Sequence, residues 1–275
     1  MSVSFNTYKT NLVQKLYNRR LINKADVQEI MASKTKCGLV ARISDCYEEK
    51  LDENCEKAKE ISKRRSVLPC EIPLVSILQS EIENMSVRFV KILSKKDTKP
   101  KVIKLKKEIK KEFGIKSLYL DNNLSFAKKI QKSLRILRDN NIPLADEIIV
   151  NSFINMSMGI ANQNKRVMLL NSKLETDWQC STDSPLHIII HEGIHVGQPD
   201  DPAIVFQMIP DKFKKTIDNL SLYASDNFIA EVHAELKTKQ LLNPKEFTNE
   251  EKQALEYIEN LFKQASHSPR FSFLL

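Results

Sequence analysis

The chain of 275 residues contains no long uninterrupted run of apolar residues. A helix needs roughly 18 to 20 such residues to cross a lipid bilayer, so no transmembrane segment is expected. The first twenty residues also lack the apolar h-region of a secretory signal peptide. These absences predict a cytoplasmic protein without a signal peptide, and the 41% hydrophobic content is sufficient for a packed core.

The cysteines form no C-x-x-C pair. The five are Cys37, Cys46, Cys55, Cys70 and Cys180. Because thiolate zinc sites use closely spaced cysteine pairs, zinc binding by cysteine is not expected. An odd number at scattered spacings is typical of reduced thiols in a cytosolic compartment.

The formal net charge of +8 is unevenly distributed. Residues 1–140 contain 31 Lys and Arg against 17 Asp and Glu, whereas residues 141–275 contain 12 against 18. A basic N-terminal part can bind nucleic acid, an anionic membrane or an acidic protein, or it can present a solvated lysine-rich surface. The lysine-rich stretch 95–116 lacks interleaved aromatic and arginine residues, so no nucleic-acid partner is expected.

The strongest functional signal is an H-E-x-x-H motif formed by His191, Glu192, Gly193, Ile194 and His195. Two histidines four residues apart lie on the same face of a helix, where neutral imidazoles can share one zinc ion. The glutamate after the first histidine can take a proton from a water bound to that ion. The motif therefore predicts a catalytic zinc site.

The flanks of the motif are those of a helix. Ser184 can cap its start, and Pro185 then occupies the first position, where a missing N–H is tolerated. Gly197 and Pro199 are expected to end it. Gly193 costs about 1 kcal/mol in a helix interior and is a mild objection.

The expected fold class is α+β, mainly helical, with a small sheet packed on the motif helix. Residues 1–116 are expected to form a helical, basic N-terminal region, and residues 117–275 the catalytic domain. Helices are predicted over residues 11–21, 24–31, 44–64, 72–93, 102–113, 124–138, 202–215 and 223–240, with a last helix begun by a capping box of Thr248 and Glu251. Strands are predicted over residues 116–120, 147–153 and 165–171, with a polar loop at 159–164. The strand at 165–171 is either an exposed edge that pairs with an extended substrate or an ordinary buried strand.

A catalytic zinc ion usually has three protein ligands and one open position, so a third ligand is required. Glu231 is the favoured candidate, on a predicted helix 36 residues after His195. Glu235 lies one turn further on the same face. It suits an outer carboxylate that orients a ligand, and it is also an alternative third ligand.

Three other residues remain as alternatives for the third ligand. Asp200 and Asp201 follow directly after the motif helix. His187 lies one turn before His191, but histidines on three successive turns cannot easily reach one tetrahedral ion. His187 is therefore expected to pack at the helix start or to contact a ligand.

The segments HEGIH and FIAEVHAEL together resemble the zincin metallopeptidases of the gluzincin type, and most closely the anthrax lethal factor-like bacterial toxin proteases. In that family the first glutamate of an E-x-x-A-E helix binds zinc, which implies Glu231 here. A tyrosine before that glutamate assists the oxyanion, which implies Tyr223. The resemblance covers roughly residues 145–240 and implies a zincin-like domain.

The function that follows is a zinc-dependent endopeptidase with a protein substrate. His191, His195 and Glu231 would bind Zn²⁺, and Glu192 would act as general base. His233, two residues after Glu231, is an alternative oxyanion group, although an exposed helix histidine is expected there because it points away from Glu231. The resemblance also implies a secreted bacterial effector that acts on a host protein.

Two other classes of protein compete with the endopeptidase. One is a non-catalytic helical binding or scaffold protein whose H-E-x-x-H is incidental or degenerate, which predicts no bound zinc. The other is a zinc hydrolase with a small-molecule substrate, which predicts a closed pocket in place of an open groove.

Overall fold

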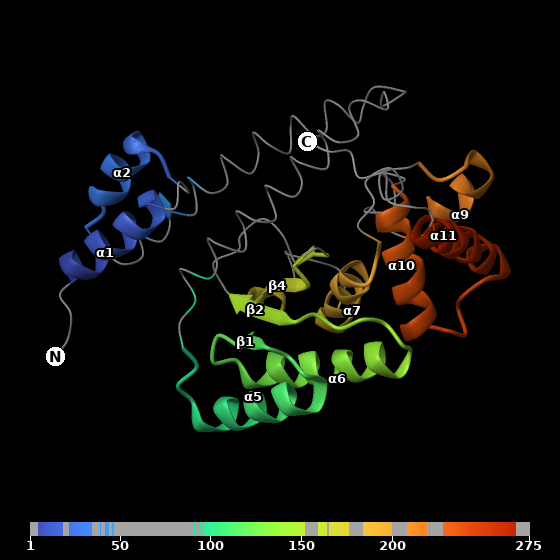
Figure 1. Ribbon diagram of the computed structural model, residues 1–275, viewed down its shortest axis with the longest axis horizontal. Coiled ribbons are helices and arrows are strands. Elements are labelled where there is room, and N and C mark those ends of the chain that lie inside the picture. Colours follow the sequence, from blue (N-terminus) through green and yellow to red (C-terminus); the bar gives the residue numbers. More distant parts are fainter. Residues whose placement is uncertain are drawn as a thin grey trace.

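The computed structural model describes part of the chain, and everything below concerns that part. The described residues are 5–18, 22–34, 39, 42–43, 46, 91, 94, 96–151, 159–163, 165–175, 184–199, 208–218, 220 and 228–267. The fold is α+β and mainly helical with a small mixed sheet, as predicted (Figure 1). Among the described helices, none has the length and apolarity needed to cross a membrane.

Two amphipathic helices lie under the sheet in Figure 1. They are α5, Pro100–Phe113, and α6, Leu124–Asp139. Pro100 occupies the first turn of α5, and Gly114 ends it in the left-handed conformation, with φ 70°. Asn123 caps α6 by accepting a hydrogen bond from the Phe126 amide at 3.0 Å. Both helices agree with the predicted apolar periodicity.

Four described strands form one sheet in the order β1-β2-β4-β3. Their bounds are Ser117–Tyr119 for β1, Glu147–Asn151 for β2, Gly159–Asn162 for β3 and Val167–Asn171 for β4. The pairs β1–β2 and β2–β4 are parallel, whereas β3 runs antiparallel to β4. The antiparallel strand is therefore at the edge of the sheet.

Of the two alternatives for the strand at 165–171, the ordinary buried strand is the one observed. β4 pairs on both sides and is buried over its whole length, which suits its run of apolar residues. The edge is β3, in a segment predicted as a polar loop. Its sequence, Gly-Ile-Ala-Asn, is too short to show the apolar–polar alternation of a strand. The segment is a strand only because it pairs with β4.

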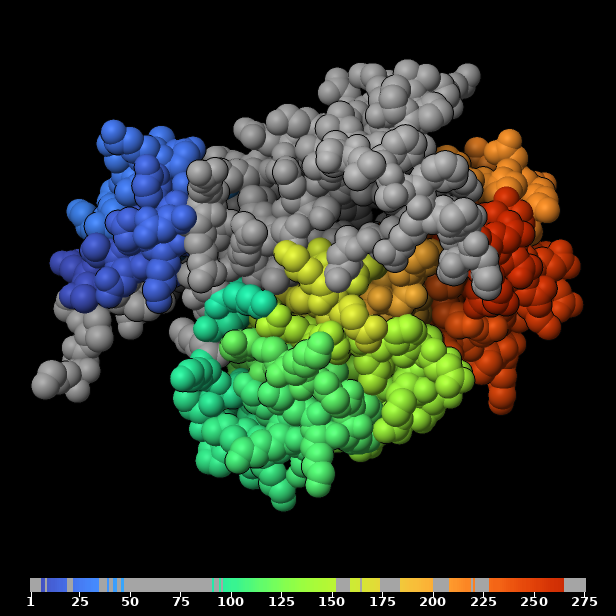
Figure 2. Space-filling view, in the orientation of Figure 1, coloured from blue at the N-terminus to red at the C-terminus, as the bar shows by residue number. Residues whose placement is uncertain are grey.

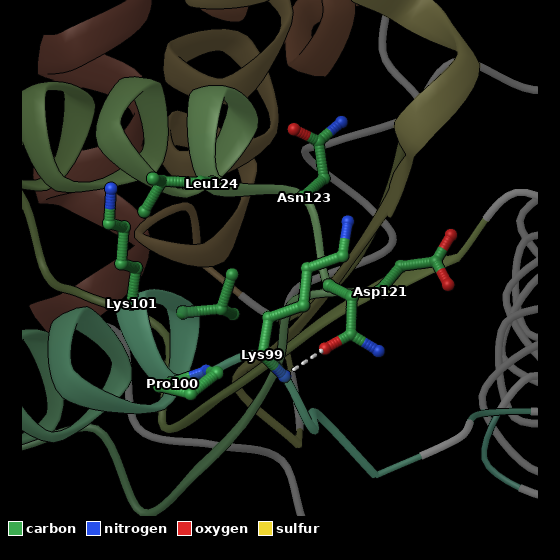
Figure 3. Close-up of a pocket in the computed structure, with 8 residues that line it drawn as sticks. Lys99, Pro100, Lys101, Asp121, Asn123 and Leu124 are labelled. Atoms are coloured by element: carbon green, nitrogen blue, oxygen red, sulfur yellow. Dashed lines mark hydrogen bonds between the residues drawn. The ribbon is translucent and has the colours of Figure 1, made fainter.

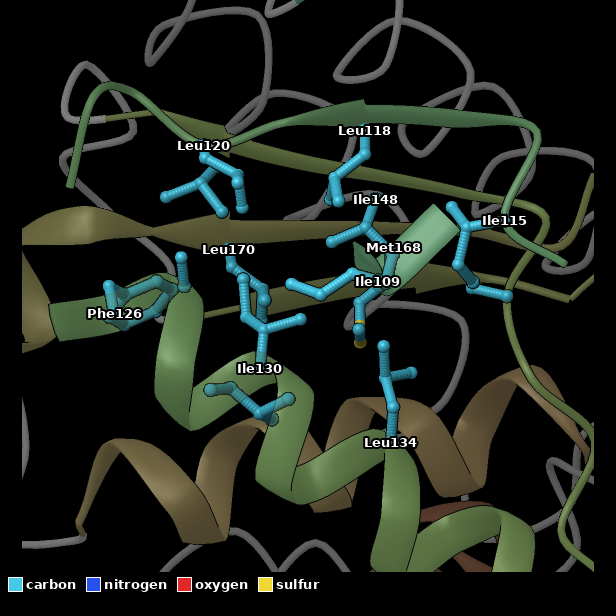
Figure 4. Close-up of a cluster of buried hydrophobic side chains, with 14 of the residues drawn as sticks. Ile109, Ile115, Leu118, Leu120, Phe126, Ile130, Leu134, Ile148, Met168 and Leu170 are labelled. Carbon is cyan, nitrogen blue, oxygen red and sulfur yellow. The ribbon is translucent and has the colours of Figure 1, made fainter. Parts of the chain in front are cut away.

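The main core fills the space between the sheet and the helices on one of its faces. Apolar side chains of α5, α6 and the motif helix meet those of β1, β2 and β4 (Figure 4). Examples are Ile109 from α5, Ile130 from α6, Ile148 from β2 and Leu170 from β4, all fully buried. The helix that carries the motif is thereby held firmly against the sheet, because its surroundings are densely packed.

The second core lies between the C-terminal helices. α10, Ile229–Leu242, packs against α11, Asn249–His267, and the short segments η2, Asp211–Phe213, and α9, Lys214–Ile217, close the cluster. The predicted capping box at the start of α11 is confirmed. Thr248 N donates to Glu251 Oε2 at 2.8 Å, and Glu251 N donates to Thr248 Oγ1 at 3.2 Å. Figure 2 shows these orange and red residues beside the green block of α5 and α6.

Two helix predictions on either side of this core need correction. The helix expected over 202–215 is absent at Met208–Pro210, where Met208 pairs with Phe228 in an isolated antiparallel bridge. That bridge holds Phe228 in an extended conformation, so α10 begins at Ile229 rather than at 223. This pairing joins residues 20 positions apart and depends on the tertiary structure, so helical periodicity does not predict it.

The N-terminal region contributes α1, Phe5–Asn18, and α2, Lys24–Met31. α2 has the predicted bounds, and α1 begins six residues earlier than predicted. Asn23 caps α2 in a capping box with Asp26. The helices predicted over 44–64 and 72–93 lie almost wholly outside the described residues.

Candidate metal centre

The H-E-x-x-H residues lie on helix α7, Pro185–Val196. Ser184 caps the helix by accepting from the His187 amide at 3.2 Å, and Pro185 occupies the first turn, as predicted. Gly193 has a packing role, because a Cβ there would lie 2.4 Å from Cδ1 of Leu137 on α6. The helix-propensity cost of this glycine is thus offset by the close approach of α6 and α7.

Three ligand atoms converge between α7 and α10. Nε2 of His191 and Nε2 of His195 are 3.0 Å apart. Oε2 of Glu231 lies 3.3 Å from the first and 3.4 Å from the second. The three residues form one of the two described groups that could hold a metal ion.

The spacing of these atoms fits a tetrahedral ion. Ligands about 2.05 Å from a tetrahedral metal are about 3.3 Å from one another. The observed distances between the three ligand atoms, 3.0, 3.3 and 3.4 Å, match that value. The side chain of Glu231 is 37% exposed, against 11% for each of the two histidines.

The outer nitrogen of His191 faces a second carboxylate. Its Nδ1 lies 3.0 Å from Oε1 of Glu235, within ion-pair distance although off the line of a good hydrogen bond. Glu235 is buried on α10, one turn after Glu231. A carboxylate behind a ligand histidine favours the tautomer that leaves Nε2 free for a metal. The position predicted for Glu235 beside a ligand is therefore the one it has.

The outer nitrogen of His195 is held by Gln198, which the sequence analysis did not single out. Gln198 Nε2 donates to the Ala230 carbonyl at 2.8 Å, which fixes the orientation of the amide because a carbonyl only accepts. Oε1 of Gln198 then accepts from Nδ1 of His195 at 2.9 Å. His195, like His191, is thereby oriented with Nε2 toward Glu231. The one sequence signal was a polar residue three positions after the second histidine.

His233 is buried, and the expectation of an exposed helix histidine was wrong. Its Nδ1 accepts from Gln198 Nε2 at 3.0 Å, and its ring packs edge-on against Phe262 of α11. Burial, together with the charge of Lys237, lowers the pKa of His233 to about 3, so the ring is neutral. His233 thus supports Gln198 and does not point toward Glu231.

We expect a Gln198→Leu variant to bind zinc about 10- to 100-fold more weakly than the native chain. Removing the acceptor leaves Nδ1 of His195 without the contact that orients its ring, and losses of this kind typically have that size. Chelator competition measures the affinity. The matched control is Gln163→Leu, because Gln163 also bonds Gln198, at 3.2 Å, but does not contact His195. Unchanged affinity in Gln198→Leu would contradict this role.

Glu192 lies beside the edge strand. It is buried, and a Cβ built on Gly159 of β3 would lie 2.4 Å from its Cγ and 2.7 Å from its Oε1. The glycine therefore lets the strand backbone pass directly over the glutamate side chain. Burial raises the pKa of Glu192, and the nearby His191 and His195 lower it without cancelling that effect. A raised pKa suits a group that exchanges protons near neutral pH.

Opposed charges occupy the centre when no metal is bound. Burial lowers the pKa of His191, but Glu231 and Glu235 outweigh it and raise that pKa to about 10. Burial likewise lowers the pKa of His195, and Glu231 outweighs it, so the pKa is raised. Burial opposes charge on Glu231, yet the two rings hold its pKa well below the usual range. A divalent cation would replace the protons of the two rings.

We therefore expect zinc binding to release protons and to weaken as the pH falls. Below pH 6.5 both histidines are protonated in the metal-free chain, so up to two protons leave per ion and the affinity drops by up to about 100-fold per pH unit. Toward pH 10 the release declines as His191 loses its own proton. Calorimetry in buffers of different ionisation enthalpy measures the released protons. A pH-independent affinity would contradict the protonated histidines.

His187 contacts Glu235 rather than the three converging atoms. Its Nε2 lies 3.5 Å from Oε2 of Glu235, and its ring stacks on that of His191 with centroids 6.3 Å apart. His187 was predicted to pack at the helix start or to contact a ligand, and it stacks on the proposed ligand His191. Tyr223, Asp200 and Asp201 lie outside the described residues.

A hollow of about 720 Å³ lies at the starts of α5 and α6, apart from the His–Glu cluster (Figure 3). Lys99, Lys101 and Asp121 are among its lining residues. The amides of Thr98 and Lys99 already donate to Oδ1 of Asn122, at 2.7 and 2.9 Å. These two backbone donors are therefore already paired.

Comparison of this chain with protein-family models, with curated proteins and with solved structures found no match. The case for a function therefore depends on the geometry of the centre itself.

Proposed function

We propose that the protein is a zinc-dependent endopeptidase. The observation that carries the proposal is the triangle formed by Nε2 of His191, Nε2 of His195 and Oε2 of Glu231, with the buried Glu192 in electrostatic contact with both histidines. Two imidazoles and one carboxylate are a donor set of catalytic zinc, and three protein ligands leave a fourth position open. A bound zinc ion would supply a water of lowered pKa and would polarise a scissile carbonyl.

The residues of the chain have separate tasks in this proposal. Glu192 takes the proton from the attacking water and passes it to the leaving amine, for which a raised pKa is suitable. Glu235 and Gln198 hold the two ligand histidines in position. Tyr223 is proposed as the oxyanion group only through the family resemblance, because it lies outside the described residues.

The edge strand supports a peptide substrate over a small molecule. β3 ends the described sheet and is antiparallel to β4, so an extended chain can add to it by backbone hydrogen bonds. Its first residue, Gly159, contacts Glu192. A peptide paired with β3 would thus pass next to the general base. We therefore propose a protein substrate, in keeping with the effector proteases that the sequence resembles.

The metal content of the purified protein tests this function. We expect one tightly bound zinc ion per chain, and a Glu231→Ala variant that has lost it, because a site with one ligand fewer binds at least about 100-fold more weakly. The zinc-loaded native protein should cleave an unfolded protein substrate and stop when a chelator is added. A native chain without tightly bound zinc, even after zinc is added back, would leave the non-catalytic binding protein as the function.

A further inference from the structure

We propose that His187 and Glu235 form a second, weaker site for a divalent transition-metal ion, one helical turn from the first. His187, His191 and Glu235 are the other described group whose ligand atoms lie together, within 4.8 Å of one another. The proposal concerns metal binding alone and stands independently of peptide hydrolysis.

The histidines of α7 and the glutamates of α10 recur once per helical turn along the contact between the two helices. His187, His191 and His195 follow one another at intervals of four residues on α7, and Glu231 and Glu235 do so on α10. Glu231 faces the rings of His195 and His191, while Glu235 faces those of His191 and His187. The arrangement of two histidines around one carboxylate is thus repeated one turn along, about 5.4 Å away.

The contact between His187 and Glu235 fits a shared cation better than a hydrogen bond. Their Nε2 and Oε2 atoms are 3.5 Å apart, beyond the usual 2.7–3.2 Å of an N–H···O bond. Two ligands about 2.05 Å from one ion and 3.5 Å from each other subtend an angle of about 117°, close to tetrahedral. Among the described residues, Nε2 of His187 has no hydrogen-bond partner although the atom is buried.

The second ion must bind more weakly than the first. When His191 uses Nε2 for the first ion, its Nδ1 keeps a proton and faces Oε1 of Glu235, so the second ion has two protein ligands and completes its shell with water. The side chain of His187 is 22% exposed overall although its Nε2 is buried, so an ion would have to enter past the exposed part of the ring. An ion held there would draw on the carboxylate that orients His191, so excess metal would act on the first centre through Glu235.

Equilibrium dialysis of the full chain against rising free Zn²⁺ tests the proposal, with metal counted by mass spectrometry. We expect two equivalents, the second on the order of 100-fold weaker. His187→Ala and the more conservative His187→Gln should keep the tight equivalent, which also reports correct folding, and lose the weak one.

Binding that stops at one equivalent in the native chain would overturn the second site. So would a weak equivalent that persists in both His187 variants. These results differ from failure of the proposed function, in which the tight equivalent itself is missing.

Discussion

A Glu192→Gln variant is expected to keep its zinc and to cleave peptides about 10³-fold more slowly. Glutamine has nearly the shape of glutamate but cannot accept a proton, so the change removes general-base catalysis, a contribution typically of 10²- to 10⁴-fold. Glu192 is not among the converging ligand atoms, and metal content should therefore stay at one tight equivalent. The measurement is kcat on a peptide substrate beside a zinc assay of the same preparation.

The zinc assay separates the two roles that a glutamate can have here. Its control is Glu231→Ala, which should lose the tight zinc equivalent and the activity together. A Glu192→Gln variant that loses zinc would make Glu192 a ligand or a structural residue. One that keeps both zinc and full activity would exclude Glu192 as the base.

A Gly159→Ala variant is expected to reduce kcat about 100-fold while zinc binding stays intact. The added Cβ would lie 2.4 Å from Cγ of Glu192, so either the strand or the glutamate must shift. Displacing a catalytic group by about 1 Å can cost 100-fold in rate. The affected carboxylate is buried, at 8% residue exposure, and has little room to move without losing its position.

A double-mutant cycle distinguishes this effect from general damage to the strand. In the Glu192→Gln background Gly159→Ala should cause little further loss of activity, because the group it displaces no longer acts as a base. Losses that multiply in the double variant would show that Gly159 acts through something other than Glu192. Thermal unfolding of Gly159→Ala provides the stability control.

The edge strand illustrates what local patterns could not predict. The sequence of β4 predicted a strand correctly, but its place in the sheet depends on pairing with β2, 20 residues earlier, as well as with β3. The segment 159–162 has no strand pattern of its own and becomes one only by pairing with β4. The contact between Gly159 and Glu192 follows from that pairing, and no sequence rule connects residues 33 positions apart.

The sequence predicted His191, His195, Glu231 and the outer Glu235 of the His–Glu centre, but not the residues behind His195. The four-residue interval of His191 and His195 is a property of any helix, and the cap at Ser184 marks where that helix begins. Glu231 followed from the helical face it shares with Glu235. The role of Gln198 was not predicted, and His233 was expected to be exposed, because the contact between the two forms only when α7 packs against α10.

The sequence by itself determined the local features: the helix at 185–196, the same-face histidines, the apolar stripes of α5, α6 and α11, and the capping box at Thr248. These depend on interactions within a few residues, which helix geometry and side-chain chemistry fix almost regardless of context. Only the tertiary structure decided the register of α10 along α7, which places each carboxylate between two histidines. Sequence patterns could not predict this register, because it is set by the burial of apolar residues far apart in the chain and not by the ligands themselves.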